Sequence, residues 1–142
     1  MKKIHFLPIL ALFAFAGCKT STVSVTETTV ELLENPIGIA AEQPRFSWKI
    51  ESETPDLMQT AYRIKVAADA AGLDQDANLI WDSGVVSSDQ SVFVSYAGPK
   101  LESRKDYWWK VLVATNKGDS VWSEPAHWSM ALLDSTDWKA QW

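Results

Sequence analysis

The sequence predicts an all-β domain, a sandwich of two sheets built from about seven short strands. From residue 28 onward, apolar and polar residues alternate with a period of 2, which is typical of strands that bury one face. Clusters of Gly, Pro, Asn and Asp between these segments predict turns. The chain has 142 residues, of which 46% are hydrophobic, so one domain of this length can form a core.

The few cysteines and histidines limit how such a sandwich can be stabilised. One cysteine and two histidines exclude a disulfide framework, a zinc site of Cys and His ligands and a Cys–His nucleophile pair. We therefore expect the sheets to close on hydrophobic burial alone, with no metal and no cofactor.

The N-terminal segment predicts export from the cytoplasm. Lys2 and Lys3 precede an apolar run, residues 4–16, that is too short to cross a bilayer. This pattern predicts a secretory signal peptide over residues 1–17. The string Phe15-Ala16-Gly17-Cys18 resembles a bacterial lipobox, which implies that Cys18 is lipidated and becomes the mature N-terminus. The alternative is ordinary secretion with a free thiol.

A lipid on Cys18 would anchor the mature protein to a membrane. We then expect a secreted, membrane-anchored lipoprotein in the periplasm or on the cell surface. Lys19, rather than Asp, after the cysteine favours the outer membrane by analogy with other lipoproteins. Residues 18–27 are rich in Ser, Thr and Val and are expected to form a tether.

The sandwich itself is expected over residues 28–133. The clearest alternating segments are residues 45–50, 62–66, 107–113 and 126–132, and weaker strands are predicted at residues 30–33, 79–81 and 91–94. Only residues 69–78 could hold a helical turn, which Gly72 weakens. The inward phase of the strands predicts a structural core of Trp48, Tyr62, Tyr107, Trp109 and Trp128, joined by Trp81.

The spacing between Leu101 and Tyr107 makes the fold class more specific. In sandwiches of the immunoglobulin and fibronectin type III kinds, a tyrosine at this corner packs its ring inward and its hydroxyl bonds to upstream backbone. Ser123-Glu124-Pro125 before the last strand also fits that pattern. The sequence thus predicts an immunoglobulin-like or fibronectin type III-like sandwich, a fold that by itself does not specify an activity.

Charge and glycine content exclude two classes of partner. Eighteen acidic and thirteen basic residues give a net charge of −5, which argues against nucleic acid. Removal of Lys2 and Lys3 with the signal peptide leaves eleven basic residues and a charge of 11 − 18 = −7. The glycines form no phosphate-binding loop, so nucleotide binding of that kind is not expected.

Several of the eight tryptophans fall outside the predicted core. These are Trp108, on the outward phase of its strand, Trp122, in a loop, and Trp138 and Trp142, beyond the last strand. Exposed indoles can stack on a glycan, but an indole seldom stays uncovered without a partner. We favour contact with another protein domain over contact with a glycan.

The search for catalytic residues yields none. Glycosidic hydrolysis needs two carboxylates that face each other across a pocket, whereas the acids here lie mostly in turns or on polar strand faces. Asp82 is predicted to bond its own backbone in a turn. His127 is predicted to be a surface residue without a partner, so no Ser-His-Asp triad is expected.

An ordered set of strings resembles one family. They are Asn35-Pro36-Ile37-Gly38-Ile39, Pro44-Arg45-Phe46-Ser47-Trp48, Gln59-Thr60-Ala61-Tyr62-Arg63-Ile64, Leu79-Ile80-Trp81-Asp82-Ser83-Gly84, Ser88-Asp89-Gln90-Ser91, Tyr107-Trp108-Trp109-Lys110-Val111, Trp122-Ser123-Glu124 and Asp137-Trp138. The set is similar to the N-terminal fibronectin type III-like domain of bacterial α-L-rhamnosidases, glycoside hydrolase family 78. It covers residues from about 30 to 142.

The resemblance implies further domains that this chain lacks. In that family, more β-sandwich domains and an (α/α)6 barrel follow, and glutamates of the barrel act as acid and base. The chain stops at Trp142, where the family continues, so we expect a truncated product with residues 134–142 starting a linker. No catalytic residue can be transferred to this sequence.

Three hypotheses follow from the sequence. The first is a non-catalytic accessory module of a secreted α-L-rhamnosidase, whose partners are the downstream domains and, through Cys18, the membrane. The second is a stand-alone carbohydrate-binding lipoprotein with Trp108 or Trp122 as its platform. The third is a surface adhesion domain with a protein partner.

Overall fold

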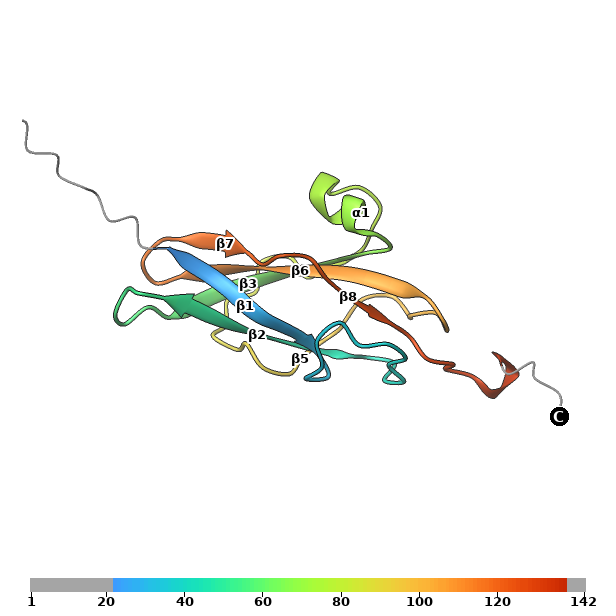
Figure 1. Ribbon diagram of the computed structural model, residues 1–142. Helices are drawn as coiled ribbons and strands as arrows, with labels where there is room; N and C mark the ends of the chain where they lie inside the picture. The colour runs from blue at the N-terminus through green and yellow to red at the C-terminus, as the bar shows by residue number, and fades with distance from the viewer. Residues whose placement is uncertain (1–21, 138–142) are drawn as a thin grey trace, which may run out of the picture.

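The computed structural model describes residues 22–137, and within that range the predicted two-sheet sandwich is confirmed (Figure 1). One sheet has the strand order β1-β2-β5, with bounds Val23–Val30, Arg45–Ser52 and Val94–Ser95. The other has the order β4-β3-β6-β7, with bounds Leu79–Asp82, Gln59–Ala67, Asp106–Thr115 and Ser120–Trp122, and β8 (Ala126–Ser129) also pairs with β6. All of these pairings are antiparallel. The helices are α1 (Ala70–Gln75) and the 3-10 turn η1 (Ser135–Asp137).

The first strand differs from the prediction. β1 begins at Val23, so residues 23–27, expected as part of a tether, belong to the sheet. The reason is the register, because Val25 pairs with Ile50 of β2 and is buried against the core. The strand predicted at residues 30–33 is wrong, since β1 ends at Val30 and the chain turns there.

Two other expected elements have different lengths. The strand predicted at residues 91–94 is reduced to Val94–Ser95, and the last strand ends at Ser129 instead of residue 132. The predicted helical turn is confirmed as α1, where the Asp69 carboxylate caps the helix by accepting from the Gly72 N–H at 2.7 Å.

Aromatic rings from both sheets fill the core. The Phe46 ring lies 4.5 Å from Trp109 and 5.6 Å from Trp128, measured between centroids. Trp48 and Tyr62 form a second edge-to-face pair at 5.4 Å. The five side chains expected in the core, Trp48, Tyr62, Tyr107, Trp109 and Trp128, are all buried, and Trp81 packs against them half-buried.

The tyrosine corner forms as its spacing predicts. The Tyr107 hydroxyl accepts a hydrogen bond from the backbone N–H of Glu102 at 2.9 Å, and Leu101 is buried beside it. The long strand β6 is therefore tied to the chain that leads into it.

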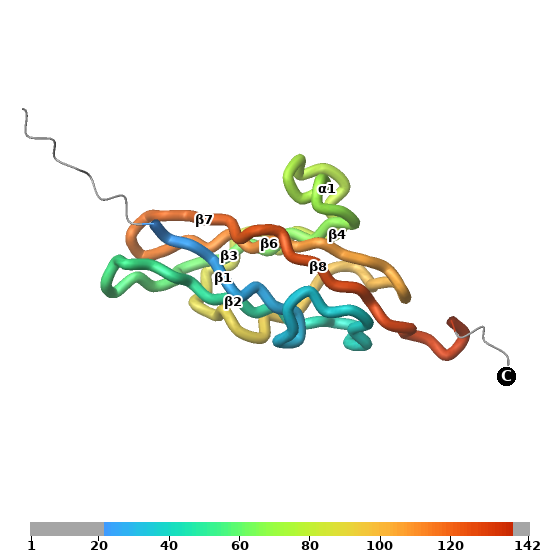
Figure 2. Tube along the Cα trace, viewed as in Figure 1, coloured from blue at the N-terminus to red at the C-terminus, as the bar shows by residue number. Residues whose placement is uncertain are grey.

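The segment after β1 closes the sandwich along β8. Gly38 and Ile39 donate their backbone N–H groups to the Ser129 carbonyl, and Ile39 forms a parallel bridge with Met130. Figure 2 shows that this loop between β1 and β2 lies toward the end of the molecule at which β8 leads into η1. No helix among residues 22–137 has the length and apolar character to cross a membrane.

Candidate functional site

The two predicted contact residues that the structure describes, Trp108 and Trp122, lie on the outer face of the larger sheet. Tyr107 and Trp109 point into the core, so the alternation of β6 turns Trp108 outward. Trp122 of β7 lies opposite Leu112 of β6, whose side chain points to the same outer face as Trp108. Both indoles are half-buried.

Trp108 is covered by a histidine. The register of β6 and β8 places His127 directly opposite Trp108, and the two rings lie 5.1 Å apart between centroids. The prediction that His127 lacks a partner is therefore wrong. The sequence alone does not indicate this contact, because it depends on the register between β6 and β8. That register is set by the segment 123–125, which separates β7 from β8.

Trp122 is engaged by two lysines. The Lys65 and Lys110 Nζ atoms lie 4.9 and 5.1 Å from the centroid of its ring. Cation–π contacts at this distance stabilise the pair, more so where the amine is desolvated. Lys65 is only 4% exposed, so its ammonium depends on its protein partners.

Asp74 of α1 and Asp76, the residue that caps its C-terminus, supply the counter-charges for these amines. Lys65 Nζ lies 2.5 Å from Asp76 Oδ1, and Lys110 Nζ lies 3.1 Å from Asp74 Oδ1. The hydrogen bond from Lys65 lowers the pKa of Asp76. Together, the helix and the two lysines cover this part of the outer face with the protein's own side chains.

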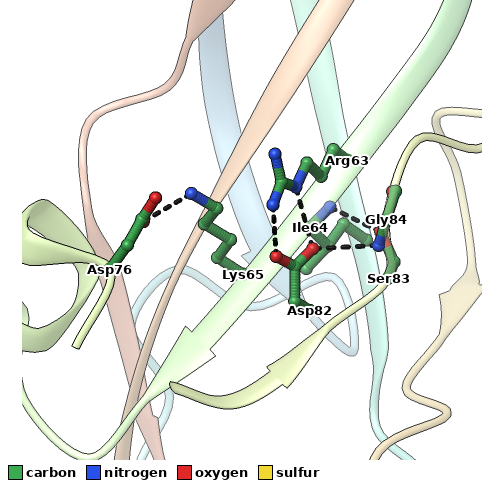
Figure 3. A network of polar contacts seen from close by, with 7 residues as sticks. All are labelled: Arg63, Ile64, Lys65, Asp76, Asp82, Ser83 and Gly84. Carbon is green, nitrogen blue, oxygen red and sulfur yellow. Dashed lines mark hydrogen bonds and ion pairs between the residues drawn. The ribbon is translucent and has the colours of Figure 1, made fainter. Parts of the chain in front are cut away.

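A third ion pair joins Arg63 of β3 to Asp82 of β4 (Figure 3). Arg63 donates from Nε and one Nη to the two carboxylate oxygens of Asp82, at 2.9 and 2.5 Å. Asp82 also accepts from the Gly84 N–H at 2.9 Å, so its predicted turn bond is confirmed. The hydrogen bonds from Arg63 lower the pKa of Asp82. The sequence prediction missed the arginine, because the pairing of β3 with β4 brings the two together.

A polar pocket lies at the end where η1 is fastened. It has a volume of about 480 Å³, and its walls include the carboxylates of Glu42, Glu102, Asp134 and Asp137. Asp137 accepts from the Ser103 hydroxyl, and Asp134 accepts from the N–H and hydroxyl of Thr136. These bonds hold η1 against the loop before β6.

Hydrogen bonds favour the charged form of two carboxylates, one of them in this pocket. The pKa of Asp134 is lowered by hydrogen bonds from Thr136, and that of Glu31 by hydrogen bonds from Arg45. A general acid of a glycosidase needs the opposite shift. Within residues 22–137, no group of three or more His, Cys, Asp or Glu side chains is placed to hold a metal ion.

Three predicted site residues, Cys18, Trp138 and Trp142, lie outside the described residues, as does the predicted signal peptide, residues 1–17. On the outer face, Trp108 contacts His127, and Trp122 contacts Lys65 and Lys110. These contacts are internal to the domain.

Comparisons with known proteins agree with the fold and the sequence strings. The family model described as the Rha78A-like, N-terminal immunoglobulin domain matches residues 25–134. The α-L-rhamnosidase of Streptomyces avermitilis is 43% identical over 123 residues, which cover 86% of this chain and 12% of that protein. An α-L-rhamnosidase of Formosa agariphila is 36% identical over 148 residues, covering 99% of this chain and 15% of that protein.

Solved structures give the same result. The crystal structure of the S. avermitilis α-L-rhamnosidase complexed with L-rhamnose matches with a TM-score of 0.80 and 42% identity, covering 85% of this chain and 12% of that one. The α-L-rhamnosidase from Dictyoglumus thermophilum matches with a TM-score of 0.79 and 31% identity, covering 84% and 13%.

This chain thus spans 12% and 15% of the length of the first two relatives. The matches confirm the predicted resemblance and correspond to one domain of a larger enzyme. The chain belongs to the family of Rha78A-like N-terminal immunoglobulin domains of α-L-rhamnosidases.

Proposed function

We propose that this domain is a non-catalytic accessory module of a secreted α-L-rhamnosidase, in which it supports and spaces the domains that hydrolyse terminal α-L-rhamnose. The observation that carries this proposal is the use of its carboxylates. Those of Asp82, Asp76 and Asp137 hold Arg63, Lys65 and Ser103 inside the domain. Carboxylates held in this way act as structural groups, which supports a role other than glycosidic hydrolysis.

The state of the outward indoles also supports a structural role. Trp108 lies against His127, and Trp122 against Lys65 and Lys110, so each already has a partner within the domain. No observation favours the alternative of a glycan platform.

The test is an assay of the purified chain on an aryl α-L-rhamnoside. We expect no release of the phenol above the uncatalysed rate, with the S. avermitilis α-L-rhamnosidase as the positive control. Turnover by this chain above the uncatalysed rate would refute the accessory role, and replacement of its four pocket carboxylates in turn would then show whether the pocket is the active site.

Membrane anchoring through Cys18 forms a separate part of the proposal. It is supported by the lipobox-like string that ends at this cysteine. Bacteria that express the chain and are fed labelled palmitate are expected to label it, and Cys18→Ser is expected to abolish the label. A labelled Cys18→Ser variant contradicts the anchor.

A further inference from the structure

We propose that the loop between β1 and β2 is a docking surface for the part of the α-L-rhamnosidase polypeptide that follows this domain in the relatives. The surface consists of Leu32, Leu33 and Ile37, and we call it the β1–β2 loop surface. This inference rests on the proposed function and assigns that module its contact residues.

Three large apolar side chains are exposed on this one loop. The exposed fractions of Leu32, Leu33 and Ile37 are 57%, 55% and 88%. Single exposed apolar residues are ordinary, but three within one short connection are an unusual concentration, of the kind that a partner can cover.

The backbone that carries Ile37 is rigid. The Pro36 carbonyl accepts from the Ser129 N–H at 3.0 Å, and the Gly38 N–H donates to the Ser129 carbonyl at 3.0 Å. Asn35 Oδ1 accepts from the His127 N–H at 3.0 Å. Both neighbours of Ile37 are thus fixed to β8, so its side chain can be buried by a partner with little further loss of backbone entropy.

The turn that carries Leu32 is held in an unfavourable conformation. The Val30 N–H donates to the Leu33 carbonyl and the Leu33 N–H donates to the Val30 carbonyl, both at 3.0 Å. Glu31 and Leu32 are therefore the two central residues of the turn. Both have positive φ, 51° and 62°, a left-handed conformation that non-glycine residues adopt only at a cost in free energy. Such turns prefer Asn-Gly.

An ion pair keeps this turn in place. Arg45 donates to both carboxylate oxygens of Glu31, at 3.1 and 2.6 Å, and its backbone N–H donates to the same carboxylate at 2.7 Å. The charge of Glu31 is therefore balanced beside two exposed leucines. The surface is apolar and rigid, as the buried centre of a protein interface is, while Glu34, between Leu33 and Ile37 in sequence, is exposed.

The occupant follows from the position of the loop. Ala131 donates its N–H to the Ile39 carbonyl at 2.8 Å, so the loop lies beside the chain that leads from β8 into η1. In the relatives this domain is N-terminal and covers 12–16% of the length, so most of the polypeptide follows the segment that passes beside this loop. The following domain is then the nearest large partner in the same molecule, at high effective concentration.

The test uses the S. avermitilis α-L-rhamnosidase with its matching segment replaced by residues 22–137 of this chain. Ile37→Asp is the test variant, and Val85→Asp is the matched control, because Val85 is 70% exposed but lies on the loop after β4. Hydrogen exchange of residues 31–38 is compared between the chimera and the free 142-residue chain. Thermal unfolding of both proteins is followed for each variant.

We expect exchange of residues 31–38 to be at least about 10-fold slower in the chimera than in the free chain. Ile37→Asp is expected to remove most of this protection and to lower the unfolding midpoint of the chimera, while the midpoint of the free chain stays unchanged. Val85→Asp is expected to leave both proteins unchanged.

Equal protection in the chimera and the free chain, or equal effects of the two substitutions, would overturn the docking surface. A chimera that is no more stable than the S. avermitilis enzyme without any such segment would instead overturn the accessory function, and the docking surface with it. The two failures are therefore distinguishable.

Discussion

At the scale of single residues, the buried polar groups of the core are unequally satisfied. Trp48 Nε1 donates to Gln59 Oε1 at 2.9 Å, and the Gln59 amide donates to the carbonyls of Ser88 and Gln90. Trp109 Nε1, by contrast, is the one buried side-chain N or O among residues 22–137 without a hydrogen-bond partner. Gln59 thus fastens the loop before β5 to the core, whereas the Trp109 ring contributes through packing alone.

The tyrosine corner gives a prediction for Tyr107→Phe. The substitution keeps the buried ring and removes the hydroxyl that accepts from Glu102 at 2.9 Å, so we expect a loss of about 1 kcal/mol in the free energy of unfolding. Urea denaturation of the two proteins measures this difference. An unchanged midpoint would mean that the Glu102 N–H finds another acceptor at no cost.

The Arg63–Asp82 pair predicts a pH dependence. Because folding lowers the pKa of Asp82, the unfolded chain binds more protons in acid, and stability rises with pH there. The contribution is present above the unfolded pKa of about 3.9 and is lost as the pH falls through the lowered folded value. Denaturant titrations between pH 2 and 5 are expected to show a shallower slope for Asp82→Asn.

The control for this prediction is Arg63→Gln. If the arginine causes the shift, Arg63→Gln flattens the same part of the pH profile as Asp82→Asn does. A profile that only Asp82→Asn changes would assign the effect to the Gly84 backbone bond instead.

At the scale of elements, α1 is held to the sheet by one apolar and two polar contacts. Leu73 is the one buried residue of the helix. Asp74 pairs with Lys110, and the C-cap residue Asp76 pairs with Lys65. Gly72 permits the close approach, since a Cβ there would lie 3.0 Å from the Ala77 carbonyl oxygen and 3.2 Å from the Ala67 Cβ. The glycine that weakens the helix in the sequence lets it pack tightly here.

Asp74 of α1 and its C-cap Asp76 are expected to differ in importance for stability. Asp76→Asn removes the counter-charge of the buried Lys65, whereas Asp74→Asn acts on Lys110, which is the more exposed amine. Asp76→Asn is therefore expected to lower the unfolding midpoint more and to speed hydrogen exchange in α1. Equal effects would show that Trp122 alone suffices to hold Lys65.

A double substitution provides the matched control. Lys65→Met with Asp76→Asn removes both charges and keeps the aliphatic stem near Trp122. It is expected to be more stable than Asp76→Asn alone, because no unpaired buried charge remains.

At the scale of the whole molecule, both sheets contribute to one core. Phe46 of β2 contacts Trp109 of β6 and Trp128 of β8. The apolar face of each sheet is therefore buried by the other sheet. We expect one cooperative unfolding transition. Tryptophan fluorescence and far-ultraviolet circular dichroism should give coincident denaturation curves. Separate midpoints would mean that one sheet persists without the other.

The alternation of apolar residues was sufficient to predict the sandwich and its core. It placed Trp48, Trp109 and Trp128 inward, because a period of 2 assigns each side chain of a strand to one face. The spacing of Leu101 and Tyr107 predicted the corner bond for a similarly local reason. The ends of β1 and β5 were not predictable in this way, since a strand extends only as far as its partner provides hydrogen bonds.

The sequence by itself determined the fold class, the buried indoles and the family, because these depend on local periodicity and on strings of adjacent residues. Only the tertiary structure decided three contacts. His127 lies against the Trp108 ring, and Lys65 and Lys110 lie over the Trp122 ring. Asp82 forms an ion pair with Arg63. Each of these contacts joins residues from different strands. Their proximity follows from the register of the sheet, which no single segment of the chain specifies.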